Sequence, residues 1–343
     1  MTCFPDWCAL AQLIRGCWSF RTLLCVGFLA ASLSPSSALA EDDDQKKEQT
    51  QKPQVHITPY GFARLDTVLL THRMNHPQYS MWVQPGDVET SASPNLTIYG
   101  RLTRVGVEFD ASEFSDTFEL KGKIEADFQN GGSESRPAPR LRHGYGKVAT
   151  DDWFGLAGQT WDLASPLYPS AHADALMWNA GNLGDRRPQL RLGWTPGDDR
   201  FGGRVAVAAG ATGAVDGKDL DVNRRLDGLQ SGLPTVQGLA EVSTTYRDDQ
   251  KLQLGVSASW ARERLGQQPG GDDSTSPSHG GKRMFHSYSL NAHLKVPLTE
   301  WFTIRGEGFY GSNLSDIRGG IGQGINPQTG DEIRSLGGWG EMV

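Results

Sequence analysis

The feature that most constrains this chain is a two-residue hydrophobic alternation, repeated in runs of about ten residues from Pro59 onward. In the clearest run, residues 117–129 (TFELKGKIEADFQ), alternate positions are apolar or small and the positions between them are charged or polar. Successive side chains of a strand point to opposite faces of its sheet, so this run predicts a strand with one apolar face and one charged face. The runs at 101–109, 250–260 and 284–298 show the same alternation. The pattern therefore predicts an all-β chain.

The connections between these runs alternate between short and long. Tight turns are predicted at 110–116, 150–152, 246–250 and 296–301. Long polar connections are predicted at 72–96, 130–139, 162–187, 213–235, 263–283 and 313–334. Short turns at one end and long loops at the other are typical of an antiparallel meander in a membrane barrel. The predicted fold class is an all-β, antiparallel transmembrane β-barrel with about 12 strands in this chain.

Composition excludes two classes of protein. The 343 residues include 33 Lys and Arg against 40 Asp and Glu, a formal net charge of -7. General nucleic-acid binders need a net basic face, so no nucleic-acid partner is expected. The chain contains no uninterrupted apolar run of about 18 to 20 residues, which excludes a helical membrane protein.

The first forty residues have the pattern of an export signal. Arg15 and Arg21 are followed by the apolar run 23–31 and by Ala38-Leu39-Ala40, an A-x-A cleavage site. We therefore predict a signal peptide over 1–40, a polar periplasmic linker over 41–57 and the barrel over 58–343. All four cysteines lie in the signal segment, so the exported chain is expected to have no disulfide, thiolate metal site or cysteine nucleophile.

Periodicity alone does not say which face meets which solvent. In a membrane barrel the apolar face meets lipid and every backbone polar group is paired within the sheet, whereas a soluble sandwich has the opposite arrangement. The sorted loops, the signal, the missing cysteines and the aromatic residues near strand ends favour the barrel. These aromatic residues are Tyr60, Phe62, Tyr99, Phe109, Trp153, Phe154, Trp161, Trp194, Trp260, Trp301, Phe302 and Tyr310.

Four segments resemble one family of bacterial porins. They are YGFARLD (60–66), RLRHGYGKV (140–148), FGLAGQTWD (154–162) and RRPQLRLGW (186–194). Their order and spacing resemble the "GF-x-x-LD", "RLRHAYGE", "AGQTW" and "RQPQ-x-R" segments of the DcaP-like trimeric porins of the Gram-negative outer membrane. The similarity covers residues 58–195 well, and 235–343 only as a general porin pattern.

The resemblance implies a 16-stranded barrel in the outer membrane, a homotrimer in outer-membrane lipid, and passive diffusion of small anionic solutes. It also implies that the long loop 162–187 is the constriction loop. The length of this connection is itself unusual, and long loops in compact proteins are usually functional or disordered. Two features depart from the family: the linker is short, and about twelve strands are counted rather than 16. A truncated fragment and a complete 12-stranded barrel both remain open.

Charged residues at inward positions are the candidate pore lining, since rings of charge set selectivity in water-filled barrels. The candidates are Arg64, Asp66, Arg104, Glu108, Lys121, Lys123, Arg140, Arg142, Arg186, Arg187, Arg191 and Arg305. Arginine holds carboxylates and phosphates bidentately, so the arginines at 140, 142, 186, 187 and 191 could form an anion-selective ladder. The alternative is that these charges pair to brace the wall, for instance Arg104 with Glu119, or Lys123 with a neighbouring carboxylate.

Other functions find little support in the residues. The chain has no GxSxG, HExxH, P-loop or dinucleotide-binding pattern, so no enzyme activity and no cofactor are expected. The eight histidines are scattered, and no metal site is predicted. An outer-membrane enzyme would need a Ser/His or Asp/His constellation on the outer rim of the barrel. Ser80 and His76 in the 72–96 connection are the candidates, but nothing in the sequence fixes them as a pair. A structural or adhesive barrel and a secreted soluble β-sandwich remain as alternatives to the porin.

Overall fold

The structure is a computed structural model of the chain. It describes residues 55–72, 74, 94–112, 115–129, 136–170, 176–198, 200–214, 231–247, 250–264, 284–326 and 329–343. The predicted signal peptide, the linker as far as Gln54, and Ser80 and His76 lie outside the described residues. No helix in the part of the chain that the structure describes is long and apolar enough to cross a membrane.

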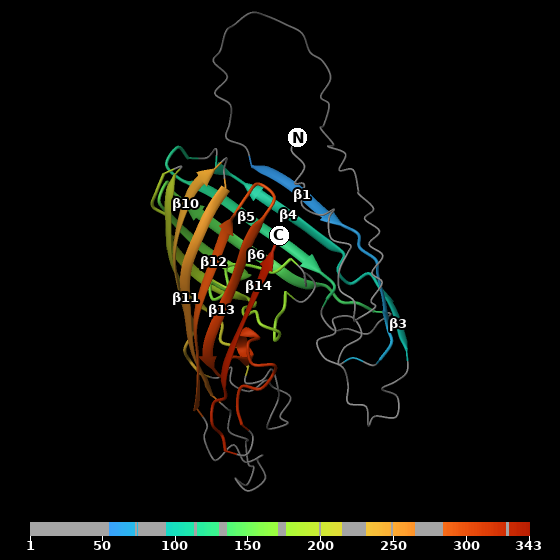
Figure 1. Ribbon diagram of the computed structural model, residues 1–343. Coiled ribbons are helices and arrows are strands. Elements are labelled where there is room, and N and C mark those ends of the chain that lie inside the picture. Colours follow the sequence, from blue (N-terminus) through green and yellow to red (C-terminus); the bar gives the residue numbers. More distant parts are fainter. Residues whose placement is uncertain are drawn as a thin grey trace, which may run out of the picture. The chain divides into compact units, whose positions relative to one another are not determined.

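The described residues form fourteen strands and one short 3-10 helix (Figure 1). The strands are β1 (His56–Phe62), β2 (Asp66–Leu70), β3 (Asn95–Tyr99), β4 (Arg104–Asp110), β5 (Glu119–Asp127), β6 (Arg140–Ala149), β7 (Trp153–Trp161), β8 (Arg186–Trp194), β9 (Phe201–Gly210), β10 (Thr235–Arg247), β11 (Gln250–Arg264), β12 (Met284–Pro297), β13 (Thr303–Ser312) and β14 (Arg334–Met342). The helix η3 (Ser315–Ile317) lies between β13 and β14.

Twelve of these strands form one sheet in the order β1-β4-β5-β6-β7-β8-β9-β10-β11-β12-β13-β14. Each neighbouring pair from β4 to β14 is antiparallel. The all-β antiparallel meander predicted from the alternation is therefore confirmed, including the number of strands in the sheet. β1 and β14 are its two edge strands within the described pairings.

The sorting of the connections by length is also confirmed. The connections 150–152 and 298–302 are tight, whereas 162–185 and 313–333 are long. One boundary differs from the prediction, because β8 begins at Arg186, so that Arg186 and Arg187 belong to the strand and not to the loop. A register that is antiparallel throughout brings all the short turns to one end of the sheet and all the long loops to the other.

The sheet has an apolar exposed face and a polar buried face. On the first face Leu190 is 67 % exposed and Leu290 61 %, whereas Ser289 on the opposite face is 1 % exposed. β5 follows the predicted pattern, since its apolar Ile124 is exposed and its Glu125 is buried. A soluble sandwich would bury the apolar set, because burial of apolar surface is what drives its folding. The exposure of this apolar face fits a sheet that meets lipid.

Aromatic side chains gather on the exposed face near both ends of the strands. At the short-turn end, the rings of Trp153 and Trp194 stack with their centroids 6.0 Å apart. At the long-loop end, the rings of Tyr288 and Tyr310 are 6.5 Å apart. Of the predicted interfacial aromatics, Phe62, Trp153, Trp194, Trp260, Trp301, Phe302 and Tyr310 are exposed. An interfacial position is wrong for Tyr60, which donates to the buried Glu125, for Tyr99, which lies in the core of a separate hairpin, and for Phe154, which packs against a buried cluster around Leu163.

A smaller unit contains the separate hairpin of β2 and β3. Its core consists of Val68, Tyr99 and Leu102. The Arg64 guanidinium donates to the Asp66 carboxylate at 2.7 Å, and the Asp66 side chain is 2 % exposed. Both predicted pore residues of this unit are thus joined to each other.

Candidate functional site

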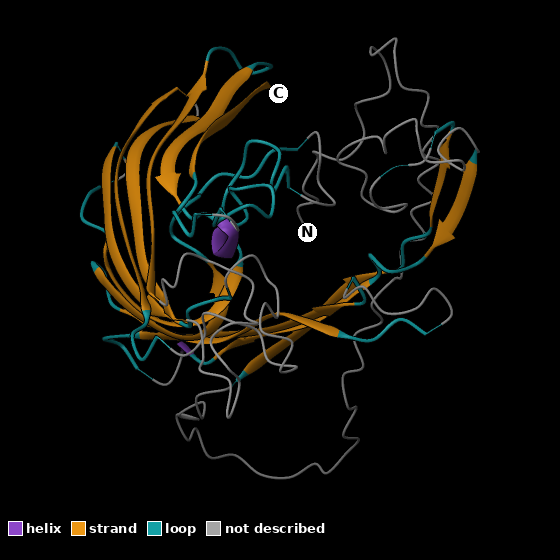
Figure 2. Cartoon of the chain, turned by 90° about the horizontal axis from the view of Figure 1, so that it is seen from below, coloured by secondary structure: helices purple, strands orange, loops and turns teal. Residues whose placement is uncertain are grey.

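The segment that follows β7 crosses the polar face of the large sheet. It lies in the concave side of the curved sheet, together with η3 (Figure 2). Leu163 N donates to Gln237 Oε1 of β10 at 2.5 Å, and Ser257 Oγ of β11 donates to Ala164 O at 2.6 Å. The segment then reaches β13 and β14. Residues 163–170 thus contact β10, β11, β13 and β14 in turn on the polar face of the sheet.

Two carboxylates of the sheet hold the far end of this crossing segment. Glu307 of β13 accepts the Leu167 N–H at 2.7 Å and a hydrogen bond from the Ser165 hydroxyl. Glu341 of β14 accepts the Ser170 N–H at 3.0 Å and the Ser170 hydroxyl at 2.8 Å. Loop backbone groups need partners when they leave water, and carboxylates supply strong ones. The two glutamates therefore fix residues 165–170 against the wall.

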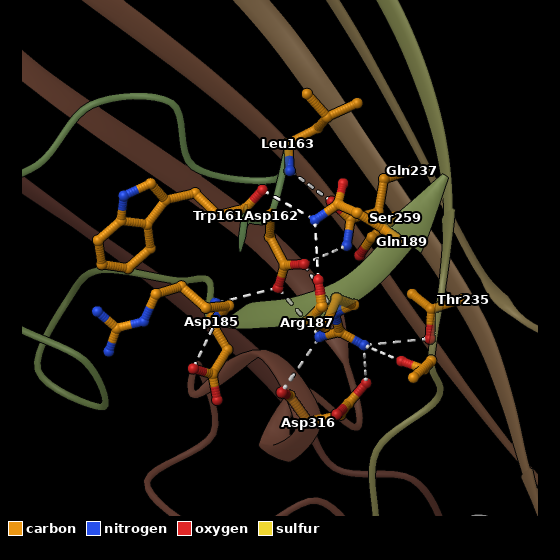
Figure 3. Close-up of polar contacts among 12 residues, drawn as sticks. Trp161, Asp162, Leu163, Asp185, Arg187, Gln189, Thr235, Gln237, Ser259 and Asp316 are labelled. Carbon is orange, nitrogen blue, oxygen red and sulfur yellow. Dashed lines mark hydrogen bonds and ion pairs between the residues drawn. The ribbon is translucent and has the colours of Figure 1, made fainter. Parts of the chain in front are cut away.

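The near end is held by a buried ionic cluster centred on Arg187 (Figure 3). The Arg187 guanidinium donates from Nε to Asp162 Oδ1 at 2.7 Å and from Nη1 to Asp316 Oδ2 at 2.7 Å. Nη1 also lies 2.8 Å from Ala211 O and 3.3 Å from Thr235 Oγ1. The side chains of Arg187, Asp162 and Asp316 are all less than a tenth exposed. Two long loops are thus joined to β8 through a single side chain.

The Asp162 carboxylate completes this cluster from the loop side. It accepts the amide of Gln237 at 2.8 Å and the Asp185 N–H at 3.0 Å, so that both ends of the 162–185 loop meet at one group. Burial raises the pKa of the Asp162 carboxyl, and the charge of Arg187 opposes that shift. Burial likewise raises the pKa of the Tyr168 hydroxyl in the same loop.

The returning half of the loop packs on η3 and on β14. Asn182 Oδ1 lies 2.7 Å from the Ser165 hydroxyl oxygen and accepts the Trp339 indole N–H at 3.2 Å. Gly181 has φ +119°, and a Cβ at that position would lie 2.5 Å from Gly338 O. Leu183 forms an apolar cluster with Phe309, Leu314 and Ile317. The close approach of position 181 to β14 requires glycine, because any other residue there would bring a side chain into the β14 backbone.

Arginine and aromatic side chains meet where β7 and β8 adjoin the loop. The Arg186 guanidinium carbon lies 4.4 Å from the ring centroid of Trp161 and 5.6 Å from that of Trp178. Trp161 also contacts the Tyr168 ring at 4.6 Å. Trp161 was predicted as an interfacial aromatic, which is wrong, since it packs against the loop. Arg186 forms no ion pair with a carboxylate among the described residues, and its Nη1 has no hydrogen-bond partner there.

The other predicted arginines of this region lie over buried carboxylates. Arg140 binds Asp127 through two bonds of 2.7 and 2.8 Å. Arg142 bridges Glu125 at 2.5 Å and Asp127 at 2.8 Å. Arg104 lies 3.5 Å from Glu125. Its proposed pairing with Glu119 is therefore wrong, because the register of β4 and β5 places Arg104 opposite Asp127.

The remaining predicted residues are spread along the sheet. Lys123 contacts Glu108 at 3.1 Å, as the bracing alternative predicted. Lys121 contacts Glu119 at 2.8 Å. Arg305 donates to Glu341 at 2.6 Å. Arg191 donates to the Gln189 side chain at 2.9 Å and to the Trp161 carbonyl. The structure thus brings Arg104, Arg140 and Arg142 together on the carboxylates of Glu125 and Asp127, and Arg142 and Arg186 both lie over the Trp161 ring.

Sequence reasoning missed the residues that hold the loops. Glu307, Glu341, Gln237 and Asp316 are distant in sequence from the residues they contact, and none stands in a recognisable motif. The only signal was the strand alternation, which places Gln237, Glu307 and Glu341 on the polar face. In the part of the chain that the structure covers, no cluster of three or more His, Cys, Asp or Glu could hold a metal ion.

Comparisons with known proteins identify the fold. Seven chains of solved structures match this chain. One is the crystal structure of the outer membrane channel DcaP of Acinetobacter baumannii, with a TM-score of 0.59 over 83 % of this chain and 73 % of that chain. The fold is that of the DcaP channel. The sequence identity with DcaP is 15 %. No protein-family model matches the chain, and a comparison with curated proteins also finds no match.

The likeness to DcaP confirms the resemblance carried by the four sequence segments. Three of those segments form β6, β7 and β8, which adjoin the arginine and aromatic cluster. At this level of identity the DcaP structure shows the fold of the chain and not its solute.

Proposed function

We propose that this chain is a porin of the Gram-negative outer membrane that lets small hydrophilic anions diffuse passively. The observation that carries the proposal is the polarity of the sheet, with apolar residues exposed on one face and charged residues on the other. Such a sheet matches lipid outside and water inside. The DcaP fold and the predicted export signal at 1–40 support the same location.

The proposed anion preference rests on the arginine side chains near the loop being more exposed than the carboxylates that they contact. The Asp127 side chain is fully buried whereas its partner Arg140 is 30 % exposed, and Glu125 is 5 % exposed beneath Arg104 at 28 %. Positive groups are thus nearer to water than the carboxylates that neutralise them. On the opposite wall, Glu307 and Glu341 are covered by the crossing loop. A solute in this space would meet mainly guanidinium groups, which bind oxyanions well.

The family resemblance adds further parts of the proposal. They are the 16-stranded barrel, the homotrimer embedded in outer-membrane lipid, and the linker 41–57 on the periplasmic side. The pathway needs no cofactor and no catalytic group, because diffusion through a water-filled channel is a matter of width and charge.

Planar-bilayer conductance of residues 41–343 under a salt gradient tests the proposal. Stable current steps with a reversal potential shifted toward that of the anion are expected. Absence of steps from a folded, inserted chain would refute the channel and would favour a structural or adhesive barrel. A chain that stays soluble without detergent would favour the secreted sandwich.

Substitution of Arg186 tests the anion preference most directly. Arg140 and Arg142 neutralise buried carboxylates, so removing them would destabilise the barrel as well as change its charge. Arg186 has no such partner among the described residues, so we expect Arg186→Gln to move the reversal potential toward zero while the barrel still forms. Lys295→Gln, which removes one charge from the polar face of β12, is the control and should change the potential less. An unchanged potential in Arg186→Gln would exclude Arg186 from selectivity.

A further inference from the structure

Near the short-turn ends of β6, β8 and β9, three positive side chains of the polar face form no ion pair among the described residues. They are Lys147 of β6, Arg191 of β8 and Arg204 of β9, whereas Lys123, Arg140 and Arg142 of β5 and β6 each contact a carboxylate. Lys147 Nζ lies 5.1 Å from the Phe154 ring centroid, and Arg191 bonds only to neutral oxygens. This part of the polar face therefore carries three positive charges that no carboxylate of the described residues pairs with.

The sheet register places these three residues around one hollow. Lys147 lies opposite Leu156 on β7, and Leu156 lies opposite Arg191 on β8. Two strand spacings therefore separate Lys147 from Arg191, which is about 10 Å between their backbones. Arg204 comes from the adjacent strand β9 and lines the same hollow, whose volume is about 750 Å³. The hollow lies toward the short-turn end, because the turn residues Thr150 and Thr195 also line it.

The acidic residues around the hollow do not cancel this charge. The Glu119 carboxylate is bound by Lys121 Nζ at 2.8 Å. Asp116 and Asp151 line the hollow from exposed turns, where water weakens their charge. Arg191 and Arg204 are close enough to repel each other. A bound anion would relieve this repulsion.

We propose that Lys147, Arg191 and Arg204 form a second anion site, separate from Arg186, for a small oxyanion that carries two or more negative charges. This site rests on the proposed channel and extends its pathway from the loop toward the short-turn mouth. Two guanidinium groups supply paired N–H donors, and the lysine supplies a compact charge. Three cations around one hollow favour a multivalent anion over a monovalent one, because each contact adds its own attraction.

Inorganic pyrophosphate is the probe for this site, with acetate as the monovalent comparison. Chloride current through the reconstituted chain is measured while either anion is added on each side in turn. Pyrophosphate is expected to block the current at lower concentration than acetate. Arg204→Gln and, separately, Lys147→Gln are each expected to weaken the block about tenfold, the loss typical of one charged hydrogen bond. Neither change leaves a carboxylate without its partner, so both variants are expected to fold.

Lys295→Gln is the matched control, since it removes one charge from the polar face outside the hollow, and it should leave the block unchanged. Pyrophosphate block that is the same in Arg204→Gln, Lys147→Gln and the parent chain would overturn the site and leave the channel proposal intact. Block that is lost only in Arg186→Gln would also overturn it, by assigning the binding to the loop region. Absence of current steps in salt alone would instead refute the channel, and the site with it.

Discussion

At the scale of single residues, neighbours in the sequence have different roles. Arg186 lies between two indole rings with no carboxylate partner in the described residues, whereas the next residue, Arg187, is saturated by two aspartates and two further oxygens. Both are arginines in the same RRPQ segment and both were predicted to line the pore. Only their surroundings separate a residue that can meet a solute from one that holds two loops together.

Removal of the Arg187 charge is expected to destabilise the barrel strongly. Arg187→Gln leaves Asp162 and Asp316 buried without their partner, a loss of about 3 to 5 kcal/mol for a buried ion pair. The measurement is the thermal transition of the folded chain in detergent, followed by its electrophoretic mobility. Lys295→Gln should leave that transition in place. A transition equally unchanged in Arg187→Gln would show that the cluster does not stabilise the fold.

At the scale of elements, the 162–185 loop takes its path from strands that lie far along the chain. Its successive contacts are with β10, β11, β13 and β14, through side chains that the sheet register places on the polar face. Backbone hydrogen bonds fix its ends and its returning half, for instance from Asp162 N to Asp185 O and from Gly184 N to Ile317 O, and these side chains hold residues 163–170. Glycine at 181 permits the approach to β14 that completes the packing.

Loss of the last anchor should loosen the loop. Glu341→Ala removes the acceptor of the Ser170 N–H and hydroxyl, so we expect larger current fluctuations and brief steps to higher conductance. Single-channel recordings report both effects. Glu300→Ala, in the exposed turn between β12 and β13, is the control for loss of one carboxylate. Recordings of Glu341→Ala that match the parent chain would show that the loop is held without this contact.

At the scale of the whole molecule, one face of the sheet is suited to lipid and the other to water. The apolar face carries exposed leucines and valines between two groups of aromatic residues, and the polar face carries the loops and the charges. The eight residue steps from Phe302 to Tyr310 span roughly 27 Å at about 3.4 Å per residue, which suits a tilted strand crossing the apolar layer.

Arginine placed in the middle of the apolar face is expected to destabilise the inserted barrel. Val256 is 58 % exposed on that face. Val256→Arg should reduce the unfolding free energy in lipid by about 2 to 4 kcal/mol, the cost reported for arginine at the bilayer midplane. Gln253→Arg, on the polar face of the same strand, is the matched control and should be tolerated. The reverse order of these two effects is expected of a soluble sandwich and would contradict the membrane fold.

Local sequence by itself determined the strands, their two faces and the sorting of their connections, because alternation and turn chemistry act over a few residues. The run 117–129 forms β5 with its predicted faces, and the turn 150–152 lies where it was predicted. Tertiary structure alone decided which charges pair. Ser170 meets Glu341, and Arg187 meets Asp316, across long stretches of chain. Such contacts depend on the register and curvature of the whole sheet, which no short segment encodes.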